Sequence, residues 1–282
     1  MVLSPLVSAL ALPALVSFGA TGLIRFARGR KGDKSLAEAG LGIGFLAGFW
    51  AVTGGLPFLG NVAYHQLGEA VLLALIVGLA ATFFGAGPRV MGVLAVAGAL
   101  FAVIWGIGWR QLVAPTVDEL LAVLIYGAIA AVAALRLRSL GPGATPVALT
   151  GLASLALALV ALFGHASGIS DLALALAGAC AGSLVWAWPF GRAGFGPMAL
   201  AVLVVGFTGL MVAQARGALH APWPLLLLPL AFWAPGIAQR LPIVDKLARK
   251  KPTKPLALLL AATLPCAACV ALAWLLGTRP HL

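Results

Sequence analysis

The chain is a succession of long apolar segments separated by short stretches of Gly, Pro and charged residues. A helix needs about 20 mostly apolar residues to cross the hydrocarbon core of a bilayer. Because lipid offers no partners to backbone polar groups, such segments are expected to be helical. The pattern therefore predicts an all-α polytopic membrane protein with about ten transmembrane helices. Their expected ranges are 5–24, 36–53, 67–85, 89–107, 117–135, 146–164, 171–188, 197–214, 222–239 and 255–276.

Composition supports a membrane protein and excludes an ordinary soluble domain. Of the 282 residues, 62% are hydrophobic and 9% are charged, whereas soluble domains carry about 25% charged residues. The ten segments leave no stretch for a separate soluble domain, so we expect one integral membrane domain over residues 1–282. The first apolar segment lacks a basic region before it and a small-residue cleavage site, which favours a span over a signal peptide.

The basic residues predict the orientation in the membrane. Fifteen of the 18 Lys and Arg residues follow odd-numbered spans, and the other three are Arg110, Arg216 and Arg279. The positive-inside rule places the larger set in the cytoplasm, so both termini are expected outside. This distribution accounts for the net charge of +11 and gives no reason to expect a nucleic-acid partner. The dense basic stretch 246–254 is expected to touch anionic membrane lipids.

The remaining polar residues have two possible interpretations. Four of the seven acids and all four histidines fall on the predicted outer side, either as the mouth of a metal or cation site or as ordinary loop residues. The second interpretation is favoured because several carboxylates begin helices, where a negative charge suits the helix dipole. The cysteines lie in apolar runs and are expected to pack there. The residues concerned are Glu69, Asp118, Glu119, Asp171, His65, His165, His220, His281, Cys180, Cys266 and Cys269.

Three segments carry a family resemblance. They are GLAATFFGAGPRV at 78–90, AGSLVWAWPFGRAGFGPMAL at 181–200, and AGLGIGFLAGF at 39–49 after a basic loop. They resemble the G-L-x-D-D-R-F-x-L-S-P-R, G-F-L-x-W-N-x-P-P-A-R-I-F-M-G-D-x-G-S and G-G-L-A-I-F-L-G motifs of the polyprenyl-phosphate sugar-1-phosphate transferases. This is the family of the MraY-type and N-acetylhexosamine-1-phosphate enzymes (glycosyltransferase family 4). The resemblance implies a ten-helix frame in the bacterial inner membrane. It also implies transfer of a sugar-1-phosphate from a UDP-sugar to a polyprenyl phosphate in cell-wall synthesis.

The departures from the family pattern fall on its catalytic acids. At those positions the chain has Ala81, Thr82, Leu135, Arg138 and Pro197, and Ala187 replaces the asparagine of the W-N-x-P segment. The family uses Mg²⁺, which binds oxygen ligands, usually carboxylates. Because these ligands are missing, we expect no metal, no cofactor and no catalytic residue. The chain is therefore expected to be a catalytically degenerate relative, a pseudoenzyme.

Four arginines of the predicted inner loops are the candidates for holding a lipid phosphate such as undecaprenyl phosphate. They are Arg89, Arg136, Arg138 and Arg192. In the transferase frame the ninth span is also expected to be broken, and the sequence 234–236 (Ala-Pro-Gly) fits a break.

Two other functions fit the sequence. One is a small ten-helix transporter with a five-plus-five inverted repeat, which predicts broken helices and a cavity near the midplane. The other is an assembly subunit in a homo- or hetero-oligomer. The Gly- and Ala-rich spans 36–53 and 171–188 permit close helix contact, either within the chain or with a partner.

Overall fold

The computed structural model describes residues 5–27, 35–54, 66–107, 116–141, 143–189, 191, 195–217, 223–248 and 253–277. Within these ranges all regular structure is helical, and eight helices are long and apolar enough to cross a membrane. The chain is therefore an all-α polytopic membrane protein, as its hydropathy pattern predicts. The eight are α1 (Pro5–Ala27), α2 (Ala39–Thr53), α3 (Gln66–Phe83), α4 (Pro88–Ile107), α6 (Ala144–Phe163), α7 (Ser167–Ala187), α8 (Pro197–Gly217) and α11 (Lys254–Gly277).

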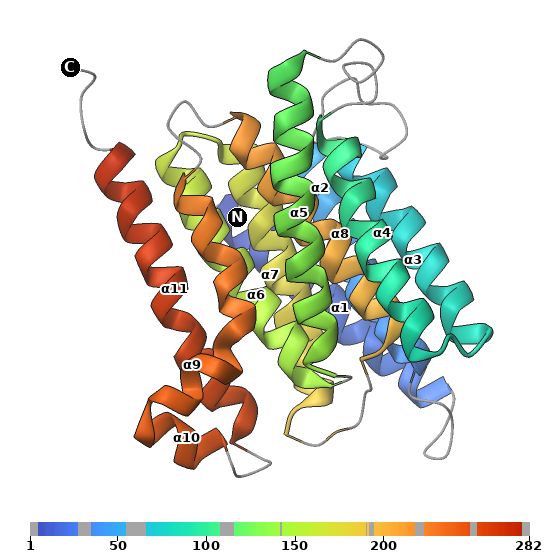
Figure 1. Ribbon diagram of the computed structural model, residues 1–282. Helices are drawn as coiled ribbons and strands as arrows, with labels where there is room; N and C mark the ends of the chain where they lie inside the picture. The colour runs from blue at the N-terminus through green and yellow to red at the C-terminus, as the bar shows by residue number, and fades with distance from the viewer. Residues whose placement is uncertain are drawn as a thin grey trace.

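Two further elements occupy the positions of the other predicted spans. Helix α5 (Val117–Ser139) has 23 residues, or about 35 Å at the usual rise, and lies against α4 (Figure 1). The 3₁₀-helix η4 (Trp223–Trp233) packs against α11, α6 and α5. All predicted spans but the ninth thus match one helix each, with ends within about one turn of the expected ones. The ninth, expected over 222–239, is covered by η4 together with the helix that follows it, α9 (Ala234–Arg240). The count of ten membrane crossings stays a prediction.

The ninth predicted span changes helix type where the sequence suggested a break. The 3₁₀-helix ends at Trp233, and α9 (Ala234–Arg240) begins directly after it with a proline in its first turn. A 3₁₀ stretch of 11 residues is unusually long; it contains Pro229, which has no N–H to donate. The short helix α10 (Pro242–Ala248) then leads to α11 at the end of the bundle (Figure 1).

Helices α6, α7 and α8 form the centre of the bundle and are the most buried of the eight spans. Helix α7 contacts α1, α2 and α6, whereas α8 contacts α3 and α4. A 3₁₀ turn, η1 (Ser35–Glu38), precedes α2 and touches α1, α3 and α8. The central helices therefore connect two groups of outer helices and hold them at fixed positions.

Helix α1 lies between α2 and α7 at very short distances, which glycines make possible. A Cβ atom built on Gly178 of α7 lies 2.3 Å from the carbonyl oxygen of Leu10, and one on Gly182 lies 2.0 Å from that of Ala14. This is the close backbone approach that small residues four apart allow between membrane helices. The small-residue faces of spans two and seven are thus used inside the chain. On α2 the glycines facing α1 are Gly40, Gly44 and Gly48.

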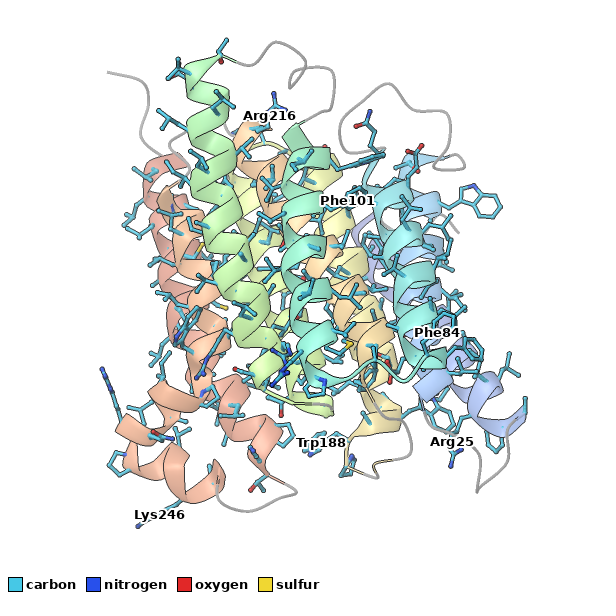
Figure 2. The ribbon with its side chains drawn as sticks, turned by 45° about the vertical axis from the view of Figure 1, so that its right-hand side comes forward. Arg25, Phe84, Phe101, Trp188, Arg216 and Lys246 are labelled. Atoms are coloured by element: carbon cyan, nitrogen blue, oxygen red, sulfur yellow. The ribbon has the colours of Figure 1, made fainter. Side chains whose placement is uncertain are left out.

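The two ends of the bundle differ in charge. Figure 2 shows Arg25, Phe84, Trp188 and Lys246 at one end, which we call the inner end, and Arg216 at the opposite end. Since Arg25 lies in the last turn of α1, α1 begins at the opposite end and runs towards the inner end. Helices α4, α6 and α8 begin at the inner end, in keeping with the alternating directions that the loop charges predict.

Candidate functional site

A cavity of about 540 Å³ lies at the inner end, where α5 ends and α4, α6 and α8 begin. We call it the inner cavity. Most of its wall is apolar, formed by residues such as Met91 of α4, Pro146 of α6 and Pro197 of α8. Arg138 and Ser139 of α5 are the polar side chains among its described lining residues. The cavity therefore combines an apolar wall with one permanent positive charge.

Helix α4 fixes the position of Arg138. The guanidinium lies over Gly92, since a Cβ atom built there falls 2.7 Å from Nη1, and Nη2 donates to the carbonyl of Pro88. A guanidinium has five N–H donors, so this bond leaves donors for a ligand in the cavity. A cation also suits the C-terminal turn of α5, where the helix dipole is negative. Arg138 is thus positioned for binding an anion.

Arg136 lies two residues earlier in α5, on another side of the helix, and packs against a different neighbour. Its Cζ atom lies 5.8 Å from the centre of the Trp233 ring, a cation–π distance. Its Nη1 is 3.5 Å from Ser139 Oγ, and Ser139 Oγ donates to the Arg136 carbonyl at 2.7 Å. Arg136 therefore flanks the cavity, between α5 and η4, without lining it.

Neither of the other two candidate arginines is among the described residues of the cavity wall. Arg89 lies in the first turn of α4 and is exposed. Arg192 lies outside the described residues. Of the four arginines that the sequence suggested, the structure places Arg138 in the cavity wall and Arg136 beside it.

The positions that correspond to the family's acids converge in part. Arg138 and Pro197 line the inner cavity together. Ala81 lies close by, because its carbonyl accepts a hydrogen bond from the amide of Ala86, which lines the cavity. Leu135 is 43% exposed and is not among the residues that line the cavity. Arg138 and Pro197 thus lie 59 residues apart in sequence but form part of the same cavity wall.

Two further positions named by the resemblance lie outside the described cavity lining. Thr82 donates its hydroxyl to the Gly78 carbonyl of its own helix at 2.9 Å. Ala187 is buried at the end of α7. Neither side chain is among the residues that form the wall. Of the positions that the resemblance named, Arg138 and Pro197 are therefore the ones that line the cavity.

Glu38 belongs to the site and was missed from the sequence. It is 2% exposed, and its Oε2 accepts a hydrogen bond from the Ala199 amide at 3.2 Å. Its Oε1 lies 3.0 Å from the position of a Cβ atom on Gly196. Since Ala199 and Gly196 line the cavity, the carboxylate lies directly behind that wall. An acid immediately before a glycine-rich apolar span was the available signal.

The carboxylate of Glu38 has a structural explanation. It lies at the N-terminal turn of α8, where a negative charge offsets the helix dipole and a backbone amide needs an acceptor. The α8 N-terminus is therefore already capped by the protein's own anion. The positive charge available in the cavity comes from arginine rather than from α8.

The residues present do not fit Mg²⁺. Among the described residues, no group of three or more His, Cys, Asp and Glu side chains comes together. The charged side chain of the cavity wall is a guanidinium, which repels a cation, whereas Mg²⁺ takes carboxylates and phosphate oxygens. The chemistry of this cavity suits an anion held directly by the protein.

The other polar candidates lie apart from the cavity. His165 is exposed in the loop after α6, and Asp118 is exposed at the start of α5; His65, His220 and His281 lie outside the described residues. The three cysteines are buried and unpaired with one another.

Comparison with known proteins gives no relative: no family model, no curated protein and no solved structure matches the chain. Function is therefore inferred from the inner cavity and from the three motifs.

Proposed function

We propose that this protein is a catalytically inactive relative of the membrane sugar-1-phosphate transferases and binds a lipid phosphate, such as undecaprenyl phosphate, at its inner end. In this proposal the chain crosses the bacterial inner membrane ten times, with both termini outside. The ten helical elements and the segregation of basic residues support that topology. The observation that carries the proposal is Arg138, the charged side chain among the described lining residues of a mostly apolar cavity at the inner end.

The binding chemistry follows from Arg138. A planar guanidinium donates two parallel hydrogen bonds to phosphate oxygens, and such charge-assisted bonds are about twice as strong as neutral ones. The bond from Arg138 to Pro88 and its packing over Gly92 hold the side chain in place. Arg136 adds a second positive charge beside the cavity. A lipid phosphate at the depth of the headgroups can therefore accept hydrogen bonds from a guanidinium that is already held in position.

Loss of transfer activity follows from the missing acids. The family's reaction needs Mg²⁺ to offset the charge of a diphosphate. The side chains of Ala81, Thr82 and Pro197 have no carboxylate that could bind this ion. Glu38 is engaged at the start of α8. The protein would hold a lipid phosphate without transferring a sugar to it, either as a carrier or in support of an active enzyme of cell-envelope glycan synthesis.

A binding measurement tests the proposal. Undecaprenyl phosphate is titrated into the purified protein, and the bound fraction is followed by native mass spectrometry. Arg138→Ala is expected to weaken binding by about 1–3 kcal/mol, or roughly 5- to 150-fold. The matched control is Arg240→Ala, which removes an exposed cation from the inner-end helix α9 and is expected to change affinity little. Equal affinity of the Arg138 variant and the unaltered protein refutes the binding site.

Inactivity has its own test. The purified protein is incubated with UDP-sugars, undecaprenyl phosphate and Mg²⁺, and formation of the lipid-linked sugar is followed. We expect no product above a protein-free control. Sustained turnover refutes the assignment as a pseudoenzyme, whatever the binding result.

A further inference from the structure

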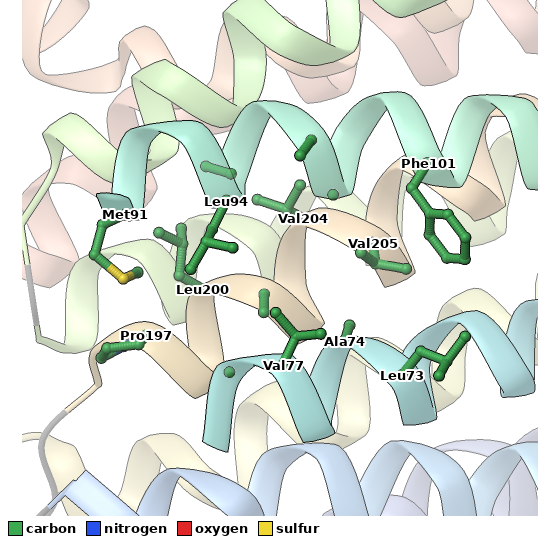
Figure 3. Close-up of a pocket in the computed structure, with 15 residues that line it drawn as sticks. Leu73, Ala74, Val77, Met91, Leu94, Phe101, Pro197, Leu200, Val204 and Val205 are labelled. Carbon is green, nitrogen blue, oxygen red and sulfur yellow. The ribbon is translucent and has the colours of Figure 1, made fainter. Parts of the chain in front are cut away.

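An apolar groove of about 300 Å³ runs along the bundle between α3 and α4, with α8 as its floor (Figure 3). It exists because α3 and α4 each pack extensively on α8 but touch each other far less. Leu73 and Val77 of α3 line it and are each 46% exposed. In a membrane protein this exposed side faces lipid, so the groove is accessible from the bilayer.

The groove begins near the inner end and runs along α4 past the midpoint of that helix, because its lining extends from Met91 to Phe101. Figure 3 shows Met91 and Pro197 at one end and Leu73 and Phe101 at the other. Met91 and Phe101 are ten residues apart on α4, which corresponds to about 15 Å along the helix. The hydrocarbon core is about 30 Å thick. The groove is therefore about half as long as that core is thick, a length comparable to that of a lipid chain in one leaflet.

The groove and the inner cavity meet. Met91, Pro197 and Leu200 line both, so a molecule extending from Arg138 past these side chains enters the groove directly. Met91 is a flexible side chain and adapts to a chain passing it. A positive charge at the membrane surface that leads into one apolar channel matches the outline of a phosphate with a single hydrocarbon chain.

We propose that the groove holds the chain of a single-chain lipid phosphate from the inner leaflet, which enters sideways between α3 and α4. The inference rests on the proposed function, because it takes the phosphate to be at Arg138. A diacyl lipid would leave its second chain outside the one groove. Lipid chains are as apolar as the groove, so burial between helices adds little hydrophobic free energy. The groove therefore selects the ligand by shape, while Arg138 supplies most of the affinity.

Photo-crosslinking tests the location of the chain. The protein in nanodiscs is exposed to a polyprenyl monophosphate with a diazirine in its chain, and labelled peptides are mapped by mass spectrometry. The comparison probes are the polyprenyl alcohol and phosphatidic acid with a diazirine in one acyl chain. We expect the monophosphate to label α4 and α8 along the groove. We expect both comparison probes to label these helices far less.

Two variants of α4 form a matched pair. Ala97 is exposed and lines the groove, so Ala97→Phe fills it; Val93 is exposed one turn away and is not among the lining residues. We expect Ala97→Phe to reduce groove labelling at least about fivefold, a loss of roughly 1 kcal/mol in binding, and Val93→Phe to leave it unchanged. Gly98→Leu is a second filling variant, since a Cβ atom there lies 3.4 Å from Val205 Cγ2, an ordinary contact.

The outcomes separate the groove from the phosphate site. Unchanged groove labelling in both filling variants, or equal labelling by phosphatidic acid, overturns the single-chain groove. Labelling of other helices that is lost in Arg138→Ala overturns the groove and leaves the proposed function standing. Labelling that is equal for phosphate and alcohol and unaffected by Arg138→Ala overturns the proposed function itself. Loss of groove labelling in Ala97→Phe and Gly98→Leu, with Arg138 dependence, supports both.

Discussion

The contact between α1 and α7 offers the sharpest test of the packing, through the substitution Gly182→Ala. The added methyl group would lie 2.0 Å from the carbonyl oxygen of Ala14 and 2.8 Å from its carbonyl carbon. Both are backbone atoms of a helix, so no side-chain rotation relieves the clash. The two helices must move apart, and α1 is itself held from its other side by the glycines of α2. The substitution is therefore expected to destabilise the bundle.

The magnitude follows from the cost of overpacking, typically about 1–3 kcal/mol, against the higher helix propensity of Ala, which offsets up to about 1 kcal/mol. Gly19→Ala is the control because a Cβ atom at Gly19 of α1 has no neighbour within 4 Å. The free energy of unfolding of both variants is measured in bicelles by steric trapping. Because the gain in helix propensity applies to both substitutions, we expect Gly182→Ala to be less stable than Gly19→Ala by about 1–3 kcal/mol. Equal stability of the two variants would show that α1 and α7 are not in backbone contact.

Two further substitutions, measured by the same unfolding assay, test buried hydrogen bonds. Ser17→Ala removes the 2.8 Å bond from Ser17 Oγ to the Ala179 carbonyl and should cost about 0.6–1.7 kcal/mol, whereas Thr263→Ala, at an exposed hydroxyl bonded within its own helix, should cost nothing measurable. Glu38→Ala leaves the buried Ala199 amide without its acceptor, at a cost of about 1–3 kcal/mol, whereas Glu38→Gln keeps an acceptor and should cost less. An equal loss for both Glu38 variants would contradict a role through that bond.

The spans were predictable because their ends are marked by residues that interrupt apolar runs. Pro88 and Pro197 stand at the first positions of α4 and α8, where proline fits a helix start, and Gly54 ends α2 with a left-handed backbone. The 3₁₀ form of η4 was not predictable. Its sequence is an unbroken apolar run, so no spacing of polar and apolar residues distinguishes a 3₁₀-helix from an α-helix. The tertiary arrangement of the spans was also open, since lipid and protein interior are equally apolar.

Small residues carried the packing information that hydrophobicity lacked. The sequence showed glycines at four-residue spacing in two spans but left open whether they face the chain itself or a partner. The structure assigns Gly178 and Gly182 to α1. The answer depended on which helix lies alongside, and that is fixed by the whole bundle rather than by any local pattern.

The residues of the candidate site were also predictable only in part. The resemblance named Arg138 and Pro197, which lie far apart in sequence and line one cavity. It also named Leu135, which is 43% exposed and is not among the residues that line the cavity. Glu38 escaped because its importance comes from burial against the start of α8, a contact between segments 161 residues apart.

In the proposed function, the arginine at one of the family's acid positions, Arg138, changes how an anion is held rather than simply removing activity. In a transferase site the carboxylates and phosphates share a metal ion, whereas in the proposed function the guanidinium of Arg138 binds the phosphate directly, provided that its charge stays uncompensated. The nearest described buried carboxylate, Glu38, is bonded to the Ala199 amide behind the α8 wall, so it offsets the α8 dipole. Restoring single acids such as Pro197→Asp would therefore place a carboxylate opposite Arg138, where an internal ion pair competes with both Mg²⁺ and phosphate. Such a variant is expected to lose lipid-phosphate binding without gaining transfer activity.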